Sequence, residues 1–143
     1  MLAVKNILEQ KGHKVWSVSP DEFVYKALEI MSDHDVGAVL VMDNWKLLGL
    51  FSERDYARKL IQKGKTVKDP KVKDYMTKSL VTVSMETDIY ECMQLMTKER
   101  VRHLPILDNN EVVGIISIGD VVNAIIQDQD MTIQDLKSYI SGA

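Results

Sequence analysis

The 143-residue chain has a single cysteine and no long apolar run, and each of these shortages excludes a class of protein. The lone cysteine, Cys92, cannot form an internal disulfide, which indicates a reducing compartment. No apolar stretch approaches the ~20 residues of a membrane-spanning helix. The first ten residues, MLAVKNILEQ, lack the apolar centre of a signal peptide. We therefore expect a soluble protein of the cytoplasm.

The motifs of common enzymes and of nucleic-acid-binding proteins are also missing. The net charge is −3, and acidic and basic residues are interspersed, so there is no basic footprint for a nucleic acid. The chain has no glycine-rich phosphate loop and no nucleophile elbow. Its three histidines and single cysteine do not have metal-ligand spacing. We expect neither an enzyme nor a metal site.

What the sequence does contain is an internal repeat. Residues 18–61 align with residues 83–126 without a gap, and 11 of the 44 positions are identical. About two or three identities would be expected for unrelated segments. Upstream, VKNIL (4–8) matches VKDYM (72–76) at an offset of 68 rather than 65. The chain is therefore a tandem duplication.

Each copy predicts the order strand, helix, strand, strand, helix. Ser19 and Ser84 end a short strand and are followed by acidic residues, which predicts that the first helix is capped there. Cys92 aligns with Ala27 on the apolar face of that helix, so we expect a buried thiol. The Asp-Asn pairs at 43–44 and 108–109 predict the turns of two hairpins.

The repeat sets the expected domain boundaries. We expect a first domain at 4–62, a linker at 63–71, a second domain at 72–127 and a helical tail at 128–143. A copy of about 60 residues is only marginally stable alone, so the two should pack together as one body. In the tail, Ile133, Leu136 and Ile140 have helical spacing. The tail is expected to fold back or to meet a partner.

Both copies close with Gly, two apolar residues, Ser, two variable residues and Asp, as in GLFSERD (49–55) and GIISIGD (114–120). With VRHLPILD and VVGIISIGDVV in the second copy, this duplicated α+β unit resembles a pair of cystathionine β-synthase (CBS) domains, called a Bateman module. The resemblance covers residues 4–126. It implies a non-catalytic regulatory module that binds an adenosine nucleotide, with AMP expected first and ATP, ADP, NAD or S-adenosylmethionine as alternatives.

The resemblance also implies site residues in two clefts. The ribose and phosphate groups are expected at Ser52, Asp55, Ser117, Asp120, Arg54, Arg102 and His103. The adenine is expected against residues of the other repeat and the stretches before the first strands: His13, Lys14, Val36, Gly37, Ala38, Thr77, Lys78, Val101, Leu104 and Pro105. Elementary chemistry agrees, because an ionised carboxylate accepts hydrogen bonds from both hydroxyls of a diol and a helix N-terminus suits a phosphate.

Plainer interpretations remain open for several of these residues. The Ser-x-x-Asp segments also fit helix caps. Arg102 and His103 also fit a solvent-facing strand edge. The linker lysines could reach a phosphate chain, although a solvated linker explains them too: Lys63, Lys65, Lys68 and Lys71.

The two copies differ at Gly37 and Ala38, where the second has Arg102 and His103, so we expect unequal sites. The resemblance further implies a homodimer and an unidentified regulated protein as partners. The rival hypothesis is a scaffold protein whose clefts no longer bind nucleotide.

Overall fold

The computed structural model describes residues 2–64 and 68–141, and its chain divides into two compact units. Residues Lys14–Leu80 form one, here called the first-repeat unit. Residues Met1–His13 and Val81–Ala143 form the other, here called the second-repeat unit. Each unit has its own buried apolar cluster. Each is described by itself below.

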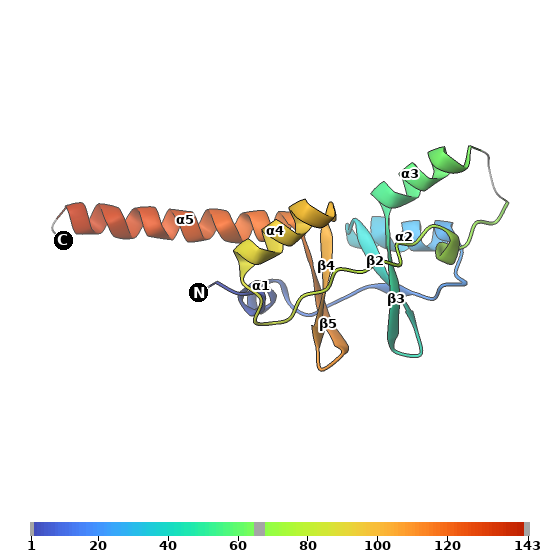
Figure 1. The fold of residues 1–143 in the computed structure, drawn as a ribbon, viewed down its shortest axis with the longest axis horizontal. Helices are drawn as coiled ribbons and strands as arrows, with labels where there is room; N and C mark the ends of the chain where they lie inside the picture. The colour runs from blue at the N-terminus through green and yellow to red at the C-terminus, as the bar shows by residue number, and fades with distance from the viewer. Residues whose placement is uncertain (1, 65–67, 142–143) are drawn as a thin grey trace. The chain divides into compact units, whose positions relative to one another are not determined.

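The first-repeat unit is a three-stranded sheet with helices (Figure 1). β1 pairs in parallel with β2, and β2 pairs antiparallel with β3. Met31 of α2 and Phe51 of β3 lie in its core beside Val72 of η1. The elements are β1 (Ser17–Val18), α2 (Val24–His34), β2 (Ala38–Asp43), β3 (Lys46–Ser52), α3 (Glu53–Lys63) and the 3-10 turn η1 (Val72–Asp74).

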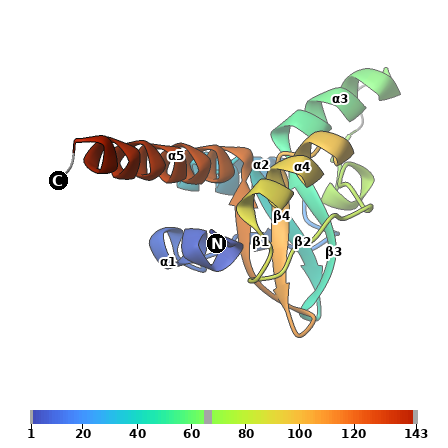
Figure 2. The same cartoon turned by 60° about the vertical axis from the view of Figure 1, so that its left-hand side comes forward.

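The second-repeat unit repeats this plan around an antiparallel hairpin. A single parallel bridge between Val83 and Ile106 takes the place of the short first strand. In the views of both Figure 1 and Figure 2, α1 lies beneath α5, which it contacts. The elements are α1 (Val4–Lys11), α4 (Ile89–Glu99), β4 (His103–Asp108), β5 (Glu111–Ser117) and α5 (Ile118–Ile140). The α+β fold expected from the repeat is confirmed.

The hairpin turns and the buried cysteine are confirmed as well. In both turns the two loop residues have positive φ, at Asn44 and Trp45 and at Asn109 and Asn110. Two-residue loops of this kind match the twist of the strands that they join. Cys92, like Ala27, has no exposed surface. Burial raises the pKa of the Cys92 thiol to about 11, so it stays protonated and behaves as a core residue.

The expected starts of the first helices at Ser19 and Ser84 are wrong, because α2 begins at Val24 and α4 at Ile89. Short-range turns occupy the intervening residues, and strand-like pairing follows them. Phe23 bridges Lys71, and the N–H of Val24 donates to Pro70 O at 2.9 Å. In the other unit Ala3 bridges Asp88 in the same way. Pairing with a distant segment therefore decides where the helix begins.

That pairing reflects an exchange of N-terminal segments between the repeats. The segment VKNIL, at the head of the first repeat, buries Val4, Ile7 and Leu8 in the core of the second-repeat unit. The segment VKDYM, at the head of the second repeat, buries Val72 and Met76 among the first repeat's strands and helix. Each unit is thus completed by a segment that precedes the other repeat.

The second helix of the second repeat and the expected tail form one continuous helix, α5, of 23 residues. Its first turns pack on α4, where the Tyr90 hydroxyl donates to Asp128 at 2.8 Å. The tail does not fold back. Its exposed apolar residues include Ile126, just before this contact, and Ile133, Leu136 and Ile140 beyond it.

Candidate functional site

In the first-repeat unit, the Ser-x-x-Asp segment opens α3. The buried Ser52 hydroxyl accepts a hydrogen bond from the Asp55 N–H at 3.1 Å, so the serine caps the helix. The Asp55 carboxylate accepts a hydrogen bond from the Thr77 hydroxyl at 2.9 Å. Thr77 is held there by paired backbone hydrogen bonds with Leu50 of β3, at 2.8 and 3.0 Å. Asp55 therefore lies beside a helix N-terminus without closing the cap.

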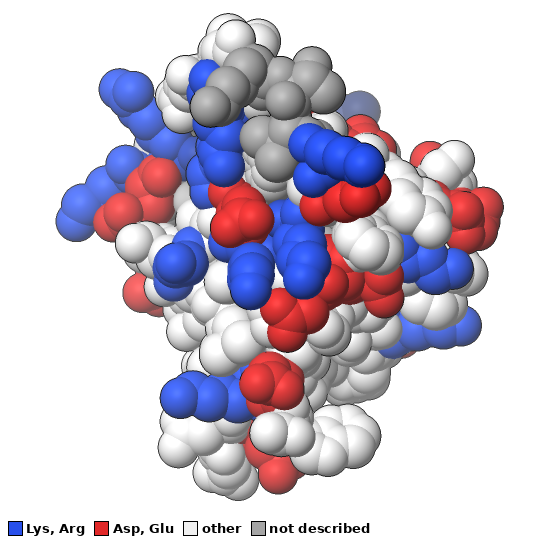
Figure 3. All heavy atoms as spheres, turned by 90° about the vertical axis from the view of Figure 1, so that its right-hand side faces the viewer, with Lys and Arg blue, Asp and Glu red and all other residues white. Residues whose placement is uncertain are grey.

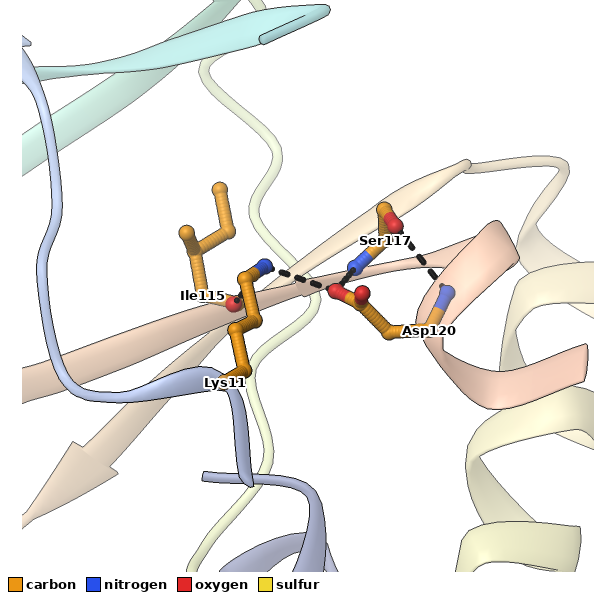
Figure 4. A network of polar contacts seen from close by, with 4 residues as sticks. All are labelled: Lys11, Ile115, Ser117 and Asp120. Carbon is orange, nitrogen blue, oxygen red and sulfur yellow. Dashed lines mark hydrogen bonds and ion pairs between the residues drawn. The ribbon is translucent and has the colours of Figure 1, made fainter. Parts of the chain in front are cut away.

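In the second-repeat unit, the matching segment opens α5 but its aspartate has different contacts (Figure 4). Ser117 and Asp120 form a complete capping box: Asp120 N–H donates to Ser117 Oγ at 3.1 Å, and Ser117 N–H donates to Asp120 Oδ2 at 2.8 Å. Lys11 of α1 also donates to Asp120 Oδ2, at 2.6 Å, and to Ile115 O at 2.8 Å. The carboxylate of the second copy is thus already used by the fold.

The Asp120 carboxyl group titrates differently from an exposed one. Its burial acts to raise the pKa, but the hydrogen bonds from Lys11 and Ser117 and the positive charge of Lys11 outweigh burial. The pKa of Asp120 therefore lies below its usual value of 3.8. The folded protein holds this group ionised more strongly than the unfolded chain does.

The Lys11–Asp120 pair should make stability depend on pH. A lowered carboxyl pKa stabilises the fold above about pH 4, and this stabilisation is lost as the pH falls through the lowered value. We expect Lys11→Met to reduce the free energy of unfolding by about 0.5–1 kcal/mol at neutral pH, and the difference from wild type to shrink towards about pH 2. Denaturant unfolding at a series of pH values measures it.

Lys5→Met is the matched control for this experiment. Lys5 also lies on α1 and pairs with a carboxylate, Glu86, at 3.4 Å, but both side chains are about half or more exposed. Its removal should change the free energy of unfolding by less at neutral pH. If the deficit of Lys11→Met stays constant down to about pH 2, an electrostatic role for the Lys11–Asp120 pair is contradicted.

In each unit, the first residue of one hairpin strand pairs with the serine of the Ser-x-x-Asp segment, which ends the other strand. Ala38 is paired with Ser52 in the β2–β3 ladder, and the Glu53 N–H donates to Gly37 O at 3.3 Å. His103 is paired with Ser117 in the β4–β5 ladder. The Ile118 N–H donates to Arg102 O at 2.8 Å. The predicted adenine-contacting stretch of each repeat therefore lies next to the Ser-x-x-Asp of its own repeat.

Side-chain exposure divides the remaining predicted residues. Ala38, Leu104 and Pro105 are buried, so they can offer a ligand their backbone at most. Gly37, Lys14, Lys78 and Arg102 are exposed, and the exposed His13 bonds through Nδ1 to Val113 O at 2.9 Å. Partly buried are Val36, Val101, His103, Arg54 and Thr77. Lys65 lies outside the described residues. Whether the two repeats share a cleft stays a prediction.

Two lysines near the aspartates were not predicted from the sequence. Lys11 contacts Asp120 across 109 positions of the chain, and no motif marks it. Lys59, one turn after Asp55 on α3, donates to Met76 O at 2.6 Å. The exchange of N-terminal segments brings both contacts about. An alignment of the repeats alone gives no signal for either.

The arrangement has the parts of a polar ligand site in each unit. Each places a carboxylate, a capping serine and a strand start around a helix N-terminus, where backbone N–H groups favour anions. Among residues 2–64 and 68–141, no group of three or more His, Cys, Asp or Glu residues is placed to hold a metal ion. In the same part of the chain, no helix is long and apolar enough to cross a membrane.

Comparison with known proteins places the chain in a family. The sequence matches the CBS domain over residues 4–62 and again over 72–127. The chain belongs to the CBS domain family and carries two CBS domains in tandem.

Individual relatives agree with this assignment. The mitochondrial CBS domain-containing protein CBSX3 of Arabidopsis thaliana is 38% identical over 149 residues, which covers 97% of this chain and 72% of that protein. The crystal structure of the CBS domain protein NE2398 is 43% identical, with a TM-score of 0.82, and covers 87% of this chain and 98% of that one. A structure of CBSX2 in complex with AMP is 28% identical, with a TM-score of 0.70, over 90% of this chain and 99% of that one.

Proposed function

We propose that this tandem CBS domain chain is a regulatory module that binds an adenosine nucleotide and signals its presence to a partner protein. The observation that carries the proposal is the position of the Asp55 carboxylate and the contacts that it makes. Its carboxylate lies at the N-terminal end of α3, accepts a hydrogen bond from the Thr77 hydroxyl, and does not close the helix cap. A carboxylate in this position can accept hydrogen bonds from both hydroxyls of a ribose.

The neighbouring groups fit the other parts of a nucleotide. The positive end of the α3 helix dipole, at its N-terminus, suits a phosphate. Gly37 precedes Ala38, the strand partner of Ser52, and its exposed backbone has no side chain to keep a planar base away. This proposal places the base of the Asp55 site against its own repeat, whereas the resemblance implied the other repeat. The relative CBSX2, solved with AMP, supports AMP as the first ligand to test. ATP, ADP, NAD and S-adenosylmethionine are the alternatives.

The proposed mechanism is a shift between two conformational populations. A nucleotide favours one conformation by no more than its difference in affinity for the two. The chain is proposed to catalyse no reaction, so its output has to be a change that another protein recognises. The relative CBSX3 is mitochondrial, so the cytoplasmic location expected from the sequence stays a prediction.

Calorimetric titration of the nucleotide-free protein with AMP, ATP, NAD and S-adenosylmethionine tests the proposal. We expect micromolar binding of at least one compound, about −8 kcal/mol. At about 100 times its dissociation constant, that compound should raise the free energy of unfolding by about 2.7 kcal/mol and the melting temperature by several degrees. No heat and no melting shift across the panel would refute nucleotide sensing.

The scaffold alternative has one observation in its favour, the exposed apolar row on α5. Ile126, Ile133, Leu136 and Ile140 follow one another at intervals of seven, three and four residues, the repeat of a coiled coil.

We propose that a second copy of the chain covers this apolar row on α5 and so forms the expected homodimer. If two α5 helices cross antiparallel near Ile133, Asp130 of one approaches Lys137 of the other, with opposite charge. Light scattering should give twice the mass of one chain, and a single mass would contradict the dimer.

A further inference from the structure

A hollow of about 520 Å³ lies beside Asp55 within the first-repeat unit. Its wall includes Thr77 and Lys78, which were predicted to line the adenine cleft, and three lysines in all, which a ribose does not use. Thr77, which donates a hydrogen bond to Asp55, belongs to its wall. The volume is in the range of small-ligand sites. The hollow is lined by Lys59, Lys73, Asp74, Met76, Thr77, Lys78 and Ser79.

The charge of this wall is unbalanced. Three of its side chains are lysines, Lys59, Lys73 and Lys78, and one, Asp74, is a carboxylate. Lys73 also pairs with the exposed Asp21 at 3.1 Å. Basic side chains gather, with carboxylates among them, on the face of the molecule that Figure 3 shows. The wall therefore has an excess of positive charge beside polar Thr77 and Ser79.

The charged form of Lys59 is disfavoured by its surroundings in this wall. It is partly buried, and its ammonium group donates to the carbonyl oxygen of Met76 at 2.6 Å. Burial lowers the pKa of Lys59, and the charges of Lys63 and Lys78 lower it further, although Asp55 acts in the opposite direction. An anion in the hollow would relieve this repulsion between lysines.

The second-repeat unit lacks two of these three lysines. At the offset of 65 residues, Lys59 corresponds to Ala124, and at the offset of 68, Lys78 corresponds to Gln10. The shared fold of a CBS domain therefore does not require a lysine at either position. Lysines at these two positions are therefore particular to the unit that carries Asp55.

We propose that this hollow binds a chain of two or more phosphates, so that the Asp55 site takes a nucleoside di- or triphosphate in preference to a monophosphate. The inference rests on the proposed function, because the nucleoside is placed by Asp55. The lysine ammonium groups act as charged donors to phosphate oxygens. The Thr77 and Ser79 hydroxyls offer further donors at the wall.

Titration of the full chain with adenosine, AMP, ADP, ATP and inorganic tripolyphosphate tests the inference, with Lys78→Gln and a Lys59→Gln/Lys78→Gln double variant. We expect wild type to bind ATP at least about tenfold more tightly than AMP. The double variant should lose this preference, because removal of the two lysines should weaken ATP binding much more than AMP binding. The loss should be smaller at high salt, because added ions screen exposed charges.

Lys46→Gln is the matched control, since Lys46 is an exposed lysine in the β2–β3 hairpin and not in the hollow. It should leave every affinity unchanged. Lys78 is exposed, so Lys78→Gln should not disturb the fold and keeps the test valid if loss of the Lys59–Met76 contact unfolds the double variant.

The outcomes separate this inference from the proposed function. AMP and ATP binding equally well to wild type, or ATP affinity unchanged in both lysine variants, would overturn the polyphosphate site and leave nucleotide sensing intact. Tripolyphosphate binding that the lysine variants lose, with no binding of adenosine or AMP, would support the hollow and refute the nucleoside site. A parallel fall in AMP and ATP affinity would also overturn the inference.

Discussion

Asp55→Ala is expected to weaken nucleotide binding by about 100-fold or more. An aspartate that accepts both ribose hydroxyls makes two hydrogen bonds to a charged group, each worth about 1.5 kcal/mol or more, and each 1.4 kcal/mol is tenfold in affinity. The loss of structure should be small, because Ser52 caps α3 through the backbone N–H of residue 55, which alanine retains. Calorimetric titration with the tightest-binding nucleotide measures the change.

Asp120→Ala provides the comparison within the same chain. Asp120 shares its oxygen with Lys11 and the Ser117 N–H, so a ribose has to displace existing contacts there. We expect its loss to weaken binding by less than about tenfold at the tightest site, while lowering stability through the lost cap. Asp33→Ala, an exposed aspartate on α2, should change neither quantity. A larger effect of Asp120→Ala on affinity would move the working site to the second repeat.

Gly49→Ala is expected to lower the free energy of unfolding by about 1–3 kcal/mol, as overpacked core substitutions do. A methyl group on Gly49 would lie 2.8 Å from the carbonyl oxygen of Thr77 and 2.9 Å from the sulfur of Met76. The carbonyl cannot withdraw without breaking its hydrogen bond with the Leu50 N–H. Because Thr77 also contacts Asp55, nucleotide affinity should fall along with stability.

Gly114→Ala separates the backbone clash from simple crowding. Gly114 is the equivalent glycine of the second repeat, but there the closest atom, at 2.8 Å, is a terminal methyl carbon of Leu8. A side-chain end can rotate, so we expect a smaller loss than for Gly49→Ala. Thermal and denaturant unfolding of both variants measure the difference. Equal losses would show that the Thr77 backbone is not the obstacle.

Much of this fold could be predicted because the sequence contains two similar copies of the same structural unit. The aligned copies predict the order of elements, the hairpin turns at Asn44 and Asn109, and the burial of Cys92, all of which depend on local patterning. The pairing of Ser52 with Asp55 and of Ser117 with Asp120 within three residues was visible for the same reason.

Features that depend on distant contacts could not be predicted. The helix starts moved from Ser19 to Val24 and from Ser84 to Ile89 because their preceding residues pair with Lys71 and Ala3. The contacts of Lys11 with Asp120 and of Thr77 with Asp55 span 109 and 22 positions. Both follow from the exchange of N-terminal segments, which has no counterpart in the spacing of residues along the chain.

The exchanged segments bear on how the chain can be synthesised and divided. Val4, Ile7 and Leu8 are synthesised more than 100 residues before Ile116 and Val121, which share their core, so they wait for these residues before they are buried. The first-repeat unit can close earlier, once Met76 has emerged. A cut between the repeats near residue 66 would leave each fragment with the other's segment. Two such fragments should therefore gain their full structure only when mixed.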